Sequence, residues 1–280
     1  MTQIRNRRTL AWALIALLVI LALIFITPML IVLMNSFKSK FFISSEPFKF
    51  PNADTFTGRE NYIEGARKIR FFSAFGYSLF ITVFSVIGIS LATSMLGWYL
   101  TRVKTRFTTI VYYLLVFSMI VPFQMVMFTM SKTANMLHLD NPIGILVLYV
   151  GFGAGLGTFM FSGFIKTIPL SLEEAAMIDG ATAVQTFFMI VYPMLKSTAI
   201  TVAILNAMWV WNDYLLPYLT IGIEYKTIPV AIQYLRGGYG AVDMGAMMAM
   251  LVLAMIPIII FYLVMQKHII RGVIAGAVKG

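Results

Sequence analysis

The chain has 280 residues, of which 60% are hydrophobic and 11% are charged. Soluble domains contain about 45–50% apolar and about 25% charged residues, so this composition argues against an ordinary soluble enzyme. The net charge of +10 could suit a nucleic acid. However, the basic residues are scattered and accompany no RNA-binding aromatic motif, so we expect no nucleic-acid partner. Without cysteine, disulfides, zinc–thiolate sites and a thiol nucleophile are excluded.

Long stretches without Asp, Glu, Lys or Arg are the strongest signal along the chain. Crossing about 30 Å of hydrocarbon takes about 20 apolar helical residues, and five stretches exceed that length. We therefore predict an all-α integral membrane protein with spans near 10–34, 74–100, 107–131, 143–165 and 244–266. The first run is longer than a signal-peptide core of about 7–15 residues, so we expect it to remain as a span.

Polar segments and a shorter apolar stretch complete the predicted order. Residues 38–72, which contain two prolines, are expected to form an irregular external loop. A further span is predicted near 191–217, because Lys196 can snorkel at one end and Asp213 can reach the other headgroup layer. Six spans place the N-terminal residues 1–9 and the tail 269–280 on one side. Counting Lys and Arg by the positive-inside rule does not decide which side.

A short polar helix is predicted at about 169–180, between the fourth and fifth spans of the domain 10–268. Ser171 can act as its N-cap, and Glu173 and Glu174 would lie in the first turn, where the helix dipole favours acids. Gly180 offers a position that ends the helix. Taken alone, this pattern is typical of a capped surface helix that connects two spans.

The residues around this helix carry a resemblance. Glu174-Ala175-Ala176, Gly180, Ile190 and Pro193 resemble the EAA signature of ABC importer permeases, with Tyr192 where Leu is usual. The resemblance implies a six-span type I ABC importer permease fold, in which the EAA helix is a cytoplasmic coupling helix that docks on a separate ATP-binding subunit. Both termini would then be cytoplasmic. The implied coupling residues are Glu173, Glu174, Ala175, Ala176, Asp179 and Gly180.

Two further segments narrow the resemblance. Residues 211–217, WNDYLLP, resemble a segment of sugar-importer permeases, with Tyr214 in place of Phe, and residues 272–280 resemble the tail of the MalG-like carbohydrate-uptake permeases. This implies a binding-protein-dependent importer of a di- or oligosaccharide in a bacterial or archaeal cytoplasmic membrane. The implied partners are a companion MalF-like permease, a dimer of ATP-binding subunits and an extracytoplasmic sugar-binding protein. In that family the equivalent of 220–242 reaches the binding protein, and the tail lies against the ATPase.

Polar residues at the end of the fifth span are candidates for the substrate path. Asn206, Trp209 and Asp213 share one helix face, and Asn212 lies beside them in sequence. Amide and carboxylate groups with an aromatic ring suit a sugar. Structural packing or gating is the alternative, since Asp213 is expected at the outer interface.

Other patterns point away from chemistry on this chain. Four glycines, at 151, 153, 155 and 157, predict close helix packing, perhaps against the companion permease. His138 and His268 lack partners at metal spacing, so no metal site is expected. The phosphate-loop motif is missing from the sequence; we therefore expect no catalytic residue and no cofactor here, with ATP and Mg²⁺ held by partner subunits.

Two alternatives stay open. A glycerol-phosphate-type ABC permease would call for cations along the path, and within the spans only Lys196 is basic. A secondary transporter would need ionisable residues inside the membrane for ion coupling.

Overall fold

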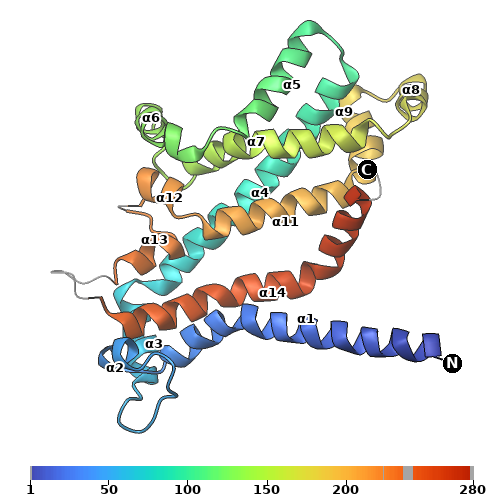
Figure 1. Ribbon diagram of the computed structural model, residues 1–280. Helices are drawn as coiled ribbons and strands as arrows, with labels where there is room; N and C mark the ends of the chain where they lie inside the picture. The colour runs from blue at the N-terminus through green and yellow to red at the C-terminus, as the bar shows by residue number, and fades with distance from the viewer. Residues whose placement is uncertain (1, 223, 236–241, 278–280) are drawn as a thin grey trace. The chain divides into compact units, whose positions relative to one another are not determined.

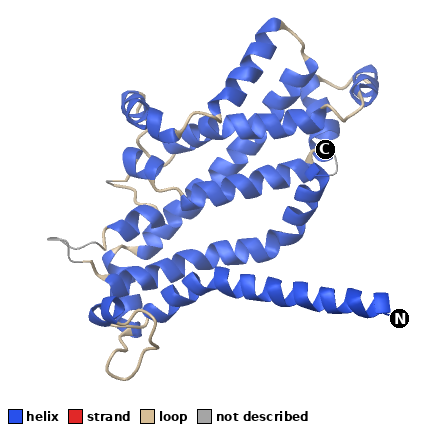
Figure 2. Ribbon diagram, in the orientation of Figure 1, coloured by secondary structure: helices blue, strands red, loops and turns tan. Residues whose placement is uncertain are grey.

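The computed structural model describes residues 2–222, 224–235 and 242–277, and the side chains of 11–222, 224–235 and 242–267. In the described part, helices joined by loops are the regular secondary structure, as Figure 2 shows, and it contains no strand beyond one isolated bridge between Lys38 and Phe56. The chain divides into two compact units, residues 1–71 with 232–257, and residues 72–231 with 258–280.

The first unit contains helices α1 (Thr2–Asn35), α2 (Lys40–Ser45) and α3 (Gly58–Lys68), and the first part of α14 (Met244–Ala277). The segment 38–72 was expected to be irregular, and this is wrong for α2 and α3. In α3 an acid lies in the first turn and two bases lie in the last turn, which complements the helix dipole. Its Gly65 lies so close to α14 that an added Cβ would stand 3.2 Å from Ala246 Cβ.

The second unit is built around two long helices, α4 (Phe71–Arg102) and α7 (Gly144–Ile165). Helix α7 lies against α5 (Arg106–Ser118) and α11 (Lys196–Asn212), as Figure 1 shows. The remaining helices are short: α6 (Phe123–Met136), α12 (Leu215–Thr220) and α13 (Ile228–Gln233). The buried core is apolar and includes side chains from α4, α7 and α11: Ile81, Ile89, Tyr149, Phe161, Ile165, Val202 and Val210.

Four helices in the described residues are long and apolar enough to cross a membrane: Ala11–Asn35, Phe71–Arg102, Gly144–Ile165 and Met244–Lys267. Two bent pairs, Arg106–Ser118 with Phe123–Met136 (110°) and Ala183–Met194 with Lys196–Asn212 (78°), raise the number to six if each pair is one span. The span predicted near 107–131 therefore corresponds to a bent pair of helices and not to one continuous helix. Pro122 stands at the break as the N-cap of α6; it lacks an N–H and disfavours helical geometry at the residue before it.

The glycines of α7 allow close packing within this chain. A Cβ on Gly153 would stand 2.8 Å from Ile89 on α4, and a Cβ on Gly157 would collide with Thr93 one turn further along α4. Gly155 faces α5, where a Cβ would stand 2.7 Å from the Leu115 carbonyl oxygen. Gly151 faces open space. Three of the four glycines thus have their close neighbours inside the second unit.

Candidate functional site

The short helix predicted at 169–180 is α8 (Leu170–Ile178). Its N-cap is Pro169, which makes no side-chain capping bond, so the assignment of Ser171 as N-cap is wrong. Gly180 has a φ of +85°, a left-handed geometry that glycine adopts without steric cost. The Ala181 N–H then donates to the Ala176 carbonyl oxygen at 2.9 Å, which closes the helix end as in a Schellman motif.

An irregular helical segment follows α8. Thr182 and Gln185 form a reciprocal capping box at the start of α9 (Ala183–Thr186). The chain then continues as a π-helix, η1 (Phe187–Val191), and as α10 (Tyr192–Met194) before the 78° bend into α11. A π-helical turn is uncommon and often occurs at functional sites.

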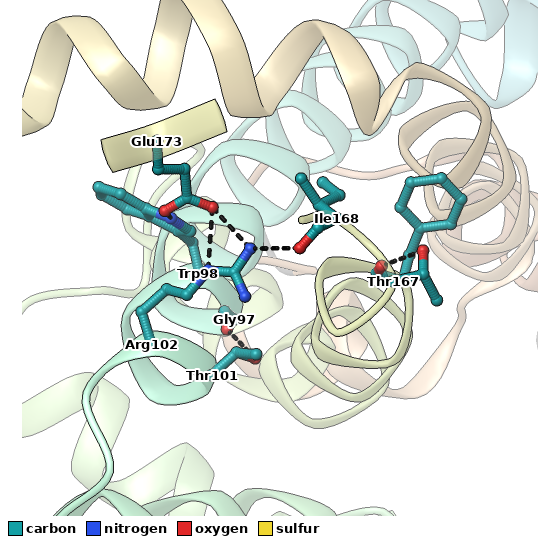
Figure 3. Close-up of polar contacts among 8 residues, drawn as sticks. Gly97, Trp98, Thr101, Arg102, Thr167, Ile168 and Glu173 are labelled. Atoms are coloured by element: carbon teal, nitrogen blue, oxygen red, sulfur yellow. Dashed lines mark hydrogen bonds and ion pairs between the residues drawn. The ribbon is translucent and has the colours of Figure 1, made fainter. Parts of the chain in front are cut away.

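Glu173 is buried, with 1% of its surface exposed. Its Oε1 accepts hydrogen bonds from Nε and Nη2 of Arg102 at 2.9 and 2.6 Å, and its Oε2 accepts one from Trp98 Nε1 at 2.9 Å. Arg102 lies in the last turn of α4 and also donates to the Ile168 carbonyl oxygen at 3.0 Å (Figure 3). The Glu173 carboxylate therefore belongs to an internal contact, whereas the resemblance implied a residue of the coupling surface.

The other predicted coupling residues have a different environment. Glu174, Ala175, Asp179 and Gly180 are exposed, and Ala176 is half-buried. Large apolar side chains on α8 are exposed beside them: Leu170, Leu172, Met177 and Ile178. Leu170, Glu174, Met177 and Ile178 fall on one face by helical spacing. An exposed apolar face around an acid is typical of a partner-binding surface.

The candidates at the end of the fifth predicted span are only partly brought together. Tyr149, which is fully buried, donates its hydroxyl to Asp213 Oδ2 at 3.1 Å, and its ring meets the Trp209 ring edge-on at a centroid distance of 5.4 Å. Asn206 is buried and bonds the carbonyl oxygen of its own helix, whereas Asn212 is exposed. Tyr149 was not among the residues predicted from the sequence. The only sign of it there is a tyrosine inside an apolar stretch.

Asp213 also ends one helix and begins the next. Its backbone is extended, and its Oδ1 accepts the N–H of Leu215 at 3.0 Å and that of Leu216 at 3.5 Å, the first two residues of α12. An Asp side chain that bonds nearby backbone competes with helix continuation. The segment predicted as a span near 191–217 is therefore not one continuous helix, because the chain bends before Lys196 and leaves helical geometry at Asp213.

An open groove of about 470 Å³ lies between α4 and the α10–α11 segment. Its lining is mostly apolar, and the only charged side chain that the structure describes in it is that of Lys196. The lining residues are Val86, Ile87, Ser90, Leu91, Tyr192, Pro193, Lys196, Ala199, Ile200 and Ala203. Among the described residues, no three His, Asp or Glu side chains are grouped in a way that could hold a metal ion.

Residues 84–275 match the family described as binding-protein-dependent transport system inner membrane component. The chain belongs to this family. It is 37% identical, over 93% of its length and 94% of the relative, to the probable starch degradation products transport system permease protein AmyC of Thermoanaerobacterium thermosulfurigenes. It is 32% identical, over 99% of its length and 100% of the relative, to the melibiose/raffinose/stachyose import permease protein MelC of Bacillus subtilis.

A further relative and a solved structure also resemble this permease. The multiple sugar-binding transport system permease protein MsmG of Streptococcus mutans is 35% identical over 94% of this chain and 95% of the relative. A crystal structure of a bacterial ABC transporter that imports the acidic polysaccharide alginate contains a chain with 24% identity and a TM-score of 0.74. That match covers 94% of this chain and 97% of the other. The permease is thus an all-helical, membrane-embedded ABC transport component.

Proposed function

We propose that this permease forms half of the translocation pore of an ATP-driven, binding-protein-dependent importer of di- or oligosaccharides. The names of its relatives support the substrate class: AmyC is named for starch degradation products, MsmG for multiple sugars, and MelC for melibiose, raffinose and stachyose. The expected partners are a companion permease, two ATP-binding subunits and an extracytoplasmic sugar-binding protein. The mechanism would be alternating access, driven by ATP hydrolysis in the separate subunits.

The exposed face of α8 is the observation that carries the coupling role. Met177 and Ile178 are 50% and 85% exposed and flank the exposed Glu174. The small Ala175 allows another backbone to approach, and the Glu174 carboxylate can pair with a basic group of an ATP-binding subunit. This role places α8, and with it both termini and the turn at 101–106, on the cytoplasmic side.

Purification of the tagged chain from its host in mild detergent tests this function. We expect a second permease and an ATP-binding subunit to accompany it, and vesicles containing the complex to take up an oligosaccharide only with ATP. Sugars and glycerol phosphate are compared as substrates. A chain that purifies alone and transports without ATP would overturn the proposal.

Glu174→Lys tests the docking face separately. Reversal of this charge should reduce recovery of the ATP-binding subunit and abolish ATP-driven uptake, while membrane insertion stays normal. Glu60→Lys is the matched control, because Glu60 is an exposed acid on α3 and is expected on the opposite side of the membrane. Equal uptake by both variants would remove α8 from the coupling role.

A further inference from the structure

The contact between Arg102 and Glu173 joins two elements that are 71 residues apart in sequence. It is largely removed from water, because the two side chains are 19% and 2% exposed. Burying an ion pair carries a desolvation penalty that its attraction often only offsets, so such a pair is weak evidence for stability. The pair has instead a well-defined geometry, with two donors of one guanidinium on one carboxylate oxygen. That geometry restricts the relative position of α8 and α4.

Two more hydrogen bonds restrict the same contact between α8 and the end of α4, which we call the joint. Trp98 Nε1 occupies the second oxygen of Glu173, and Arg102 Nη2 reaches the Ile168 carbonyl oxygen just before α8 begins (Figure 3). Both oxygens of the carboxylate are thus bonded to the last two turns of α4. Helix α8 cannot tilt or slide along α4 without breaking charge-assisted hydrogen bonds.

The Trp98 ring extends this joint toward α11. Its centroid lies 5.4 Å from that of Phe187, the first residue of η1. Phe187 is buried and in turn lies 5.8 Å from Tyr192, centroid to centroid. The end of α4 therefore contacts both α8 and the irregular segment that leads from α8 into α11.

We propose that Arg102, Glu173 and Trp98 are positioning residues that make α8 and the end of α4 move as one body. Pressure from a partner on the exposed face of α8 then reaches α4 through Glu173 and Arg102, and reaches η1 through Trp98. The two adjacent acids have separate roles: Glu174 faces the partner, and Glu173 holds the helix that carries it. This inference rests on the proposed docking of α8 to an ATP-binding subunit.

The test uses the complex purified with its own ATP-binding subunit and binding protein. The readout is the ratio of ATPase rates with and without sugar-loaded binding protein. Arg102→Met and Glu173→Gln should leave the complex assembled and bring this ratio close to one, and Arg102→Lys, which keeps the charge and loses the fork, should give an intermediate ratio. Arg106→Met, an exposed cation at the start of α5, should keep the full ratio.

A cross-link separates transmission from folding. The chain has no cysteine, so Arg102→Cys with Glu173→Cys creates the only two thiols on it. A flexible bis-methanethiosulfonate reagent, added in membranes before extraction, should restore most of the lost ratio, which a mere folding defect would not allow. The unsubstituted complex with the same reagent is the control. If Arg102→Met fails to assemble, the comparison of the double-cysteine variant before and after cross-linking tests the positioning role instead.

The proposed positioning role would be overturned if Arg102→Met and Glu173→Gln kept the full ratio of ATPase rates. It would also be overturned if the cross-linked cysteine pair kept a ratio close to one. Failure of the unsubstituted chain to bind any ATP-binding subunit would instead overturn the proposed function. The two results are distinguishable because the second appears without any substitution.

Discussion

Asp213 accepts hydrogen bonds from the Tyr149 hydroxyl and from the backbone N–H groups of Leu215 and Leu216. It joins three helices in this way, since Tyr149 belongs to α7 and the two amides begin α12. A structural role therefore accounts for Asp213 and for the ring of Trp209 packed on Tyr149. A place on the substrate path is a separate proposal for these residues.

We predict that Asp213→Ala lowers the stability of the permease measurably. Loss of the acceptor for the Leu215 and Leu216 N–H groups should cost about 1 kcal/mol, as for a lost helix cap, and a buried hydroxyl without a partner costs about 1–3 kcal/mol. Asp213→Asn keeps an acceptor for these N–H groups and should cost less. The measurement is thermal unfolding in detergent, followed by tryptophan fluorescence. Asn212→Ala, at an exposed neighbour, is the control, and equal midpoints for Asp213→Ala and Asn212→Ala would contradict the prediction.

Asp243 lies just before α14, and its carboxylate pairs with the Lys68 ammonium at 2.5 Å. Burial raises the pKa of Asp243, but the hydrogen bonds from Lys68 and from the Ala246 N–H outweigh this, so its pKa lies below its ordinary value. A depressed carboxyl pKa stabilises the folded state above the unfolded pKa of about 4, and this stabilisation is lost as pH falls through the folded value.

Lys68→Met should therefore destabilise the permease at pH 7 and destabilise it less at pH 3, where Asp243 begins to take up a proton. Because Lys68 is half exposed, the difference at pH 7 should be at most about 1 kcal/mol. Unfolding midpoints of both proteins at the two pH values are the measurement. A Lys68→Met deficit that is as large at pH 3 as at pH 7 would show that lost packing, rather than the charge pair, is responsible.

At the scale of elements, the contact of α7 with α4 depends on glycines at two successive turns. Gly157→Ala should destabilise the permease by about 1–3 kcal/mol, because the added methyl group meets Thr93 and forces the helices apart. Gly151→Ala is the matched control, since its Cβ would meet nothing within 4 Å. Thermal unfolding of the two variants decides, and a midpoint for Gly157→Ala equal to that of Gly151→Ala would contradict the close contact.

Helix positions were predictable where an apolar run is uninterrupted. The ranges predicted near 74–100 and 244–266 fall within α4 and α14, and the range 143–165 begins one residue before α7. Hydropathy could not find the breaks at Pro122 and Asp213, because both lie among apolar neighbours. The helix is interrupted at Pro122 because proline lacks an N–H, and at Asp213 because its side chain accepts hydrogen bonds from the backbone N–H groups that follow it.

At the scale of the whole molecule, orientation in the membrane is the property to test. Ala53 precedes α4 in the chain and Lys104 follows it, and both residues are exposed. Because the chain has no native cysteine, a single thiol can be introduced at each position. We predict that a membrane-impermeant maleimide labels Ala53→Cys on intact cells and labels Lys104→Cys only after permeabilisation. The reverse pattern would place α8 outside the cell and exclude its docking on a cytoplasmic ATPase.

The membrane environment, the permease family and the position of α8 were predictable from the sequence, because long apolar runs and a spaced motif are local properties of a chain. The fold was needed to show that Glu173 faces inward while Glu174 faces outward, that Tyr149 meets Asp213, and that Gly153, Gly155 and Gly157 face α4 or α5. Each of these depends on which side of one helix meets another that is far away in sequence. Two neighbouring glutamates look alike in a motif, and only the approach of Arg102 from the end of α4 distinguishes them.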